Sequence, residues 1–205
     1  MSAPDNRLKA DEGKKPARLP VLAFDSSRAW EAWLAKHHAG ASGVWLRIYK
    51  KASGMASVTY PQALDAALCY AWIDSHKRPM DALSWLQRFG PRRARSGWSR
   101  LNTQHAERLI KARRMKPAGL KEIEAAKTDG RWQRAYDSPS AAAVPAAFLE
   151  ELSRNKRAKA FFEGLNKANT YAIAYRLQTA KKAETREKRM RSILAMMAKG
   201  EKFHP

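Results

Sequence analysis

The chain has little of what would stabilise it covalently or hold it in a membrane. Its 205 residues include one cysteine, Cys69, which excludes an internal disulfide and a zinc site built on several cysteines. The longest clean apolar run, from Ala67 to Ile73, has seven residues, whereas a transmembrane helix needs about 20. The first residues carry charges and prolines where a secretory signal has its apolar segment. We therefore expect a cytoplasmic protein with no membrane span.

The sequence patterns of common enzymes are also absent. The chain contains no GxxxxGK[ST], GxGxxG, HExxH or GxSxG motif, and no pair of carboxylates in an apolar setting. His37 and His38 are adjacent, but no third ligand lies nearby at metal-binding spacing. The sequence therefore predicts no metal and no cofactor, and it favours a protein without catalytic activity.

Acidic residues are few relative to basic ones. There are 40 lysines and arginines against 19 acids, a formal net charge of +21. Residues 76–116 hold 12 basic and 2 acidic side chains, and residues 151–205 hold 14 and 5. Such a regional excess attracts polyanions. It predicts an anionic small molecule or an acidic protein as partner and leaves nucleic acid possible, although a basic surface without a specific partner would have the same composition.

Hydrophobic periodicity predicts an α+β fold, in which a small helix-and-strand unit precedes a C-terminal helical module. Residues 1–20 are predicted to be a flexible basic tail. Residues 21–137 are predicted to form the α+β unit. It begins with a helix capped by Ser26 or Ser27, a strand at 44–50 and a buried helix after Pro61. A turn at 74–79, a strand at 83–89 and two further helices follow, the first of them capped by Ser99. Residues 138–146 have the composition of a linker, and residues 147–200 show four short amphipathic helices, the last capped by Thr185.

Six segments, in order along the chain, match the motifs of one bacterial family. They are ALDAALCYAWID at 63–74, QRFGPRR at 87–93, SGWSRLN at 96–102, MKPAG at 115–119, AKTDGRW at 126–132 and AKKAETR at 180–186. On these segments the chain resembles the YdeI/OmpD-associated (bacteriocin-protection) family over roughly residues 24–200. The resemblance implies a small α+β unit followed by a helical module, and a role in bacterial stress or bacteriocin tolerance.

Four positions depart from the motifs of that family. The family has glycine where this chain has Ala71, Ser75 and Arg113, and threonine where it has Gly90. Glycine accepts backbone conformations that other residues avoid. Any local geometry that depends on those glycines is therefore expected to be loosened in this chain.

An arginine-rich segment before a predicted helix is the strongest functional candidate. Arginine binds phosphate or carboxylate through paired hydrogen bonds, tryptophan offers a face for stacking, and serines with nearby helix amides add donors. The predicted anion site comprises Arg88, Arg92, Arg93, Arg95, Ser96, Trp98, Ser99 and Asn102. The alternative is a solvated loop around a core tryptophan.

A second cluster of pocket candidates comprises Cys69, Tyr70, Trp72 and Asp74. A nucleophilic cysteine needs a base, usually histidine, and an electropositive setting. The alternative, which we favour, is a buried and inert thiol beside a turn-forming aspartate, because free cysteine commonly lies in the core. Trp45 differs from most of the seven tryptophans, because it lies on the Arg47 side of its predicted strand and is expected to line a surface groove.

These observations favour a non-catalytic tolerance protein of the YdeI/OmpD-associated type that binds an anionic ligand or partner. Two alternatives stay open. One is a basic protein that binds nucleic acid without sequence preference, and the other is an enzyme that uses Cys69 and Asp74.

Overall fold

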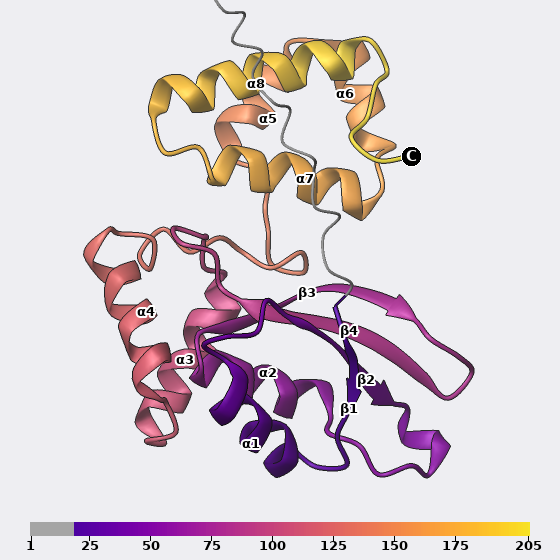
Figure 1. The fold of residues 1–205 in the computed structure, drawn as a ribbon. Coiled ribbons are helices and arrows are strands. Elements are labelled where there is room, and N and C mark those ends of the chain that lie inside the picture. Colours follow the sequence, from indigo (N-terminus) through magenta and orange to yellow (C-terminus); the bar gives the residue numbers. More distant parts are fainter. Residues whose placement is uncertain (1–18) are drawn as a thin grey trace, which may run out of the picture. The chain divides into compact units, whose positions relative to one another are not determined.

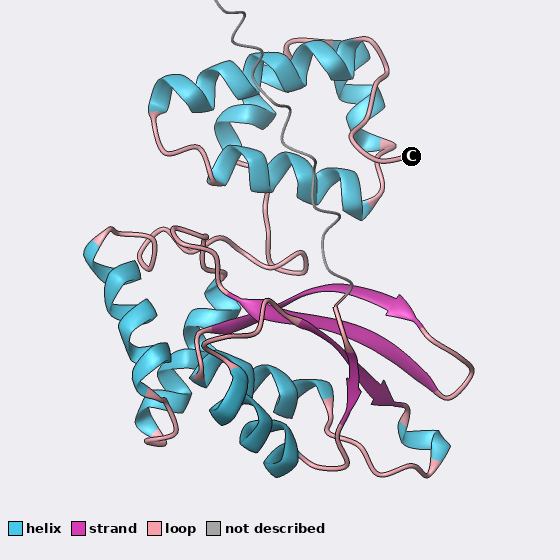
Figure 2. Ribbon diagram, viewed as in Figure 1, coloured by secondary structure: helices cyan, strands magenta, loops and turns pink. Residues whose placement is uncertain are grey.

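The computed structural model describes residues 19–205, so most of the predicted basic tail lies outside the described residues. The chain divides into two compact units, each made of two segments. Among the described residues, the first unit is 19–63 together with Ile73–Pro91, and the second is Leu64–Trp72 together with Arg92–Pro205. Strands are confined to residues before 92, and the described chain beyond them is helix and loop apart from one isolated bridge (Figure 2). The predicted α+β fold class is confirmed.

The strands of the described residues form one sheet in the order β1-β2-β4-β3 (Figure 1). The strands are β1 (Val21–Ala23), β2 (Val44–Tyr49), β3 (Trp72–Pro79) and β4 (Ser84–Pro91). β1 runs parallel to β2, and β2 runs antiparallel to β4. The strand predicted at 44–50 is confirmed, because Val44, Leu46 and Ile48 are at most 1% exposed while the residues between them are half-buried.

Helix α1 (Ser27–His37) covers the buried face of this sheet (Figure 1). Its predicted cap is confirmed: the Ser26 side chain accepts a hydrogen bond from the backbone N–H of Ala29 at 3.3 Å. Trp30 is fully buried, its ring centroid lies 5.7 Å from that of Phe89, and its indole N–H donates to the Ala63 carbonyl at 3.1 Å. One tryptophan therefore joins α1 to β4 and to the next helix, α2 (Tyr60–Cys69).

The turn predicted at 74–79 was wrong, because these residues belong to strand β3. The strand has no alternating pattern that sequence analysis would detect, since all residues from Ser75 to Pro79 are exposed. It forms because it lies at the edge of the sheet beside β4, where backbone hydrogen bonds rather than buried side chains hold it. Strand β1 was missed as well, since three residues are too few to show a period.

Helices α3 (Arg100–Lys111) and α4 (Pro117–Thr128) follow the sheet along the chain. The predicted cap of α3 is confirmed, since Ser99 Oγ accepts a hydrogen bond from the backbone N–H of Asn102 at 3.2 Å. Helix α4 begins with Pro117, a residue that is favoured in the first turn of a helix. A Cβ atom built on Gly119 would lie 2.5 Å from the Cys69 carbonyl oxygen, so α4 approaches the end of α2 at a distance that only glycine allows.

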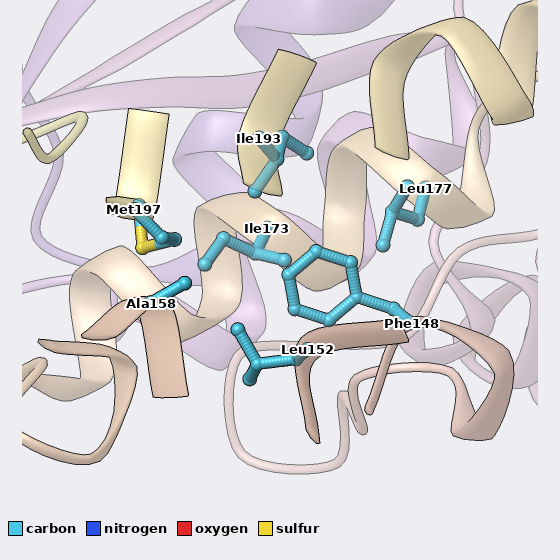
Figure 3. Packing of buried hydrophobic residues seen from close by; sticks show 7 residues of the cluster. All are labelled: Phe148, Leu152, Ala158, Ile173, Leu177, Ile193 and Met197. Atoms are coloured by element: carbon cyan, nitrogen blue, oxygen red, sulfur yellow. The ribbon is translucent and has the colours of Figure 1, made fainter. Parts of the chain in front are cut away.

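Residues 141–205 hold the four predicted helices, α5 (Ala146–Ser153), α6 (Lys156–Glu163), α7 (Lys167–Gln178) and α8 (Ala183–Ala198). They surround a core shown in Figure 3, whose members are Phe148, Leu152, Ala158, Ile173, Leu177, Ile193 and Met197. The cap predicted for the last helix was wrong: α8 begins at Ala183, Lys182 occupies the cap position, and Thr185 lies in the first turn. None of the helices in the described residues is long and apolar enough to cross a membrane.

Candidate anion-binding site

The arginine-rich segment that the sequence singles out forms a loop held against the protein. The Arg92 guanidinium lies 3.9 Å from the centroid of the Trp98 ring and donates a hydrogen bond to the Gly97 carbonyl at 2.8 Å. Trp98 itself is 2% exposed and packs against Trp132, with ring centroids 4.9 Å apart. The structure therefore brings Arg92 and Trp98 together as a stacked pair on the core.

A residue that sequence reasoning missed, Arg131, holds this loop in place. It is 7% exposed and donates hydrogen bonds to the Ser96 carbonyl at 2.9 Å, to Glu122 at 2.8 Å and to Asp129 at 2.7 Å. Burial opposes its charge, but the two carboxylates outweigh burial and the pKa of Arg131 is raised. In the sequence, Arg131 belongs to the AKTDGRW segment at 126–132. Its contact with the loop, through the Ser96 carbonyl, is visible only in the folded structure.

The other residues of the predicted anion site do not all lie beside the Arg92–Trp98 pair. Arg93 and Arg95 are exposed, while Arg88 lies in β4 opposite Trp45. The side-chain oxygen of Ser96 and the indole N–H of Trp98 are buried and make no hydrogen bond within the described residues. Two arginines and two buried polar atoms of the loop are thus left for a ligand, while Ser99 and the backbone of Asn102 serve the helix cap.

The second predicted cluster is largely core. Cys69 is fully buried, Trp72 is 1% exposed and Tyr70 is 7% exposed. Asp74 is half-buried and accepts a hydrogen bond from the Tyr60 hydroxyl at 2.9 Å. Burial, together with the Asp74 charge and this hydrogen bond, raises the pKa of Tyr60. A thiol with no exposed surface agrees with the inert cysteine that the sequence favours.

A large cavity that was not predicted lies within the helical module. We call it the α7–α8 cavity, and its volume is about 750 Å³, inside the range typical of small-molecule sites. Helix α7 and its end supply part of the lining, α8 supplies most of the rest, and Phe203 closes one side. The lining residues are Tyr175, Arg176, Thr179, Thr185, Lys188, Arg189, Ser192, Ile193 and Phe203.

One stripe of α8 faces this cavity. Thr185, Lys188, Arg189 and Ser192 recur at i, i+3, i+4 and i+7, which places them on one face of the helix. Beside this polar stripe runs the apolar one that contributes Ile193 and Met197 to the core. The polar stripe is the signal that sequence reasoning overlooked, because four polar residues at helical spacing are usually a solvated surface.

The two arginines of the cavity are held in place. Arg189 donates hydrogen bonds to the Arg176 carbonyl at 2.7 Å and to the Thr179 hydroxyl at 3.4 Å. The Arg176 guanidinium lies 3.8 Å from the centroid of the Phe203 ring. Phe203 is fixed in turn by Asn169, which is 1% exposed and accepts hydrogen bonds from the backbone N–H groups of Phe203 at 3.0 Å and His204 at 2.9 Å.

The charges around the α7–α8 cavity are of one sign. None of its lining residues, all within the described part of the chain, is acidic, and no acidic side chain of residues 19–205 forms an ion pair with Arg176, Lys188 or Arg189. Four hydroxyl groups, of Tyr175, Thr179, Thr185 and Ser192, stand among these cations, but those of Thr179 and Ser192 already donate to the backbone carbonyls of Tyr175 and Lys188. Guanidinium and ammonium groups are donors suited to phosphate, sulfonate or carboxylate oxygens.

The described residues contain no cluster of metal-ligating side chains. Over residues 19–205 there is no group of three or more histidine, cysteine, aspartate or glutamate side chains placed to hold a metal ion. The lining of the α7–α8 cavity offers neither an imidazole nor a carboxylate nor a thiol as general base or nucleophile. The charged side chains in its lining are all cationic.

Comparison with known families gives two matches along the chain. Residues 22–122 match a family described only as a domain of unknown function, and residues 141–200 match the family described as bacteriocin-protection, YdeI or OmpD-associated. Neither the curated proteins nor the solved structures gave a match. Of the segments that carried the resemblance, AKKAETR at 180–186 lies inside the second match, AKTDGRW at 126–132 lies between the two, and the others lie inside the first. The resemblance is confirmed for residues 141–200, where the helical module matches the family described as bacteriocin-protection, YdeI or OmpD-associated.

Proposed function

We propose that the protein is a non-catalytic tolerance protein whose helical module binds a small anionic ligand in the α7–α8 cavity. The family match suggests a bacteriocin-protection or stress-related role. The observation that carries the ligand class is the cavity itself: three cations line a volume of about 750 Å³, with no acidic residue among the lining residues. A phosphate-bearing small molecule with an aromatic or apolar body fits best, because Tyr175 and Phe203 add ring surface to the cationic wall.

Short-range bonds rather than diffuse attraction should dominate binding. Exposed charges attract weakly and are screened beyond about 8–10 Å at physiological salt. A hydrogen bond to a charged group is worth about 1.5–3 kcal/mol when its geometry is formed beforehand. Arg189 and Arg176 are fixed by their own contacts, so little side-chain entropy is lost on binding. Binding should therefore persist at moderate salt.

The experiment is calorimetric titration of the full chain with phenyl phosphate, inorganic phosphate and acetate at constant ionic strength. We expect phenyl phosphate to bind most tightly. The double change Arg176→Gln, Lys188→Gln removes two cationic donors. If each residue loses one charged hydrogen bond worth about 1.5 kcal/mol, the affinity for phenyl phosphate should fall about a hundredfold. Arg189 is left unchanged because its hydrogen bonds join α8 to α7.

A matched control removes the same charge from the same module. Arg157 and Lys159 are exposed on α6 and do not line the cavity. The double change Arg157→Gln, Lys159→Gln should leave the affinity for phenyl phosphate within about twofold of the unchanged chain. Equal losses in the two double variants, with a steep dependence on salt, would contradict a defined site.

The arginine loop is the rival site for the same ligand class. Its exposed Arg93 and Arg95, with the buried and unbonded Ser96 hydroxyl, support it. The double change Arg93→Gln, Arg95→Gln separates the two sites. A hundredfold loss in this variant, with none in Arg176→Gln, Lys188→Gln, would move the anion site from the helical module to the loop.

A further inference from the structure

A second basic surface lies on the sheet, on the face opposite the buried one. The register pairs Trp45 with Arg88 and Tyr49 with Ser84, so these residues project from the same face, away from Val44, Leu46 and Ile48. Trp45, Arg47, Tyr49 and Arg88 are half-buried, and Arg78 of β3 is exposed. We call these five residues the basic–aromatic face.

Cations lie directly over the rings of this face. The Arg78 guanidinium is 4.1 Å from the centroid of the Trp45 ring, and that of Arg47 is 4.5 Å from the Tyr49 ring. Because β4 lies between β2 and β3, the Arg78 side chain extends across β4 to reach Trp45, and Leu86 of β4, on the same face, is 2% exposed. Each ring therefore has a guanidinium over one of its faces.

The charge of this face is neutralised by its neighbours only at Arg47. Asp81 forms an ion pair with Arg47 at 2.6 Å. No acidic side chain within residues 19–205 forms an ion pair with Arg78 or Arg88. Lys77 belongs to the opposite face, because its ammonium group lies 5.0 Å from the centroid of the Trp85 ring and Trp85 pairs with Ile48. The basic–aromatic face thus keeps two cations without an ion pair, Arg78 and Arg88, beside the Trp45 ring.

We infer that the basic–aromatic face binds single-stranded nucleic acid. Arg78 and Arg88 would hold phosphates, while an unstacked base would stack on Trp45 with the Arg78 guanidinium on its outer side. A duplex does not fit this chemistry, because its bases are stacked on one another and hidden from a sheet. An acidic protein would satisfy the charges but would leave the rings without a role.

The inference is tested by fluorescence anisotropy of the full chain with a labelled single strand of about 15 nucleotides of mixed sequence. We expect the strand to bind at least tenfold more tightly than its duplex. Trp45→Leu keeps the apolar bulk but removes the aromatic face, so it should weaken binding about tenfold with the salt dependence unchanged. Trp45→Phe keeps a ring and should lose much less.

The contribution of the cations is tested by measuring how the affinity for the single strand depends on salt concentration. Arg78→Gln should lower the slope of log affinity against log salt by about 0.7, the value for one phosphate contact of a single strand. Lys121→Gln, at an exposed lysine on α4, should leave the slope unchanged. Equal binding of strand and duplex, equal affinity for polyglutamate, or a Trp45→Leu variant that binds as tightly as the unchanged chain would each overturn the inference.

Discussion

Ala71 and Arg113 adopt a backbone conformation that usually belongs to glycine. Ala71 has φ 59° and Arg113 has φ 55°. Both positions therefore hold a left-handed backbone conformation with a side chain that disfavours it. The Ala71 carbonyl accepts a hydrogen bond from the Arg92 N–H at 2.9 Å, and such contacts hold the strained conformation in place. A Cβ atom in this region costs about 1–2 kcal/mol.

Glycine at these positions should stabilise the protein. Ala71→Gly and Arg113→Gly should each raise the free energy of unfolding by about 0.5–1 kcal/mol, since strain relief exceeds the entropy that glycine adds to the unfolded chain. The measurement is thermal unfolding, where the midpoint should rise by about 1–4 °C. Ala125→Gly, exposed inside α4, is the control and should lower the midpoint by a similar amount. A fall with Ala71→Gly would contradict the account of strain.

At the scale of elements, a close approach in the second unit joins α4 to the end of α2. Besides the Cys69 carbonyl, a Cβ on Gly119 would meet the Leu68 carbonyl oxygen at 2.9 Å. The Cys69 carbonyl also accepts a hydrogen bond from the Lys116 N–H at 3.2 Å, just before α4 begins. These backbone contacts explain the glycine of the MKPAG segment, because no side chain fits between the two elements.

Gly119→Ala should therefore be strongly destabilising. Two of the three nearest obstacles are backbone carbonyl oxygens, which cannot move away as the third, the end of the Met115 side chain, would, so we expect a loss of about 2–3 kcal/mol. Urea unfolding of the full chain measures the loss. Gly40→Ala is the matched control, because a Cβ there has nothing within 4 Å, and it should change stability by less than about 0.5 kcal/mol. Similar effects of the two changes would show that α4 does not pack tightly on α2.

The elements show which parts of the fold the sequence could predict. Helix α1, strand β2 and the cap of α3 follow from local signals, namely a serine cap and clear periods of 3.6 or 2. Strand β3 could not be predicted, because its residues form a strand only through pairing with β4. The α7–α8 cavity was missed for a similar reason: Arg176, Lys188 and Phe203 are brought together by helix packing, which no short motif records.

At the scale of the whole molecule, the helical module has a core of its own. Every member of the cluster in Figure 3 lies between Phe148 and Met197. The family match covers the same stretch, residues 141–200. The boundary predicted at residues 138–146 stays a prediction, and it has a direct consequence: residues 141–205 should fold without the rest of the chain.

The isolated fragment 141–205 should be helical and unfold cooperatively, although weakly, because a domain this small buries little surface. Circular dichroism with thermal unfolding is the measurement. Ile173→Ala should abolish the transition, since Ile173 is fully buried and the loss of about 2–5 kcal/mol equals the stability that such a core supplies. Leu149→Ala, at a residue that is 43% exposed, should leave the transition in place. A fragment with no cooperative transition would show that the module depends on the remainder of the chain.

The most direct test of the anion site is nuclear magnetic resonance of the isotope-labelled full chain during titration with phenyl phosphate. The account predicts that the largest backbone amide shifts occur at Thr185, Lys188, Arg189 and Ser192, that they saturate together, and that they vanish in Arg176→Gln, Lys188→Gln. Largest shifts at Arg93 and Arg95 instead, or small shifts spread over the basic residues without saturation, would contradict an anion site in the α7–α8 cavity.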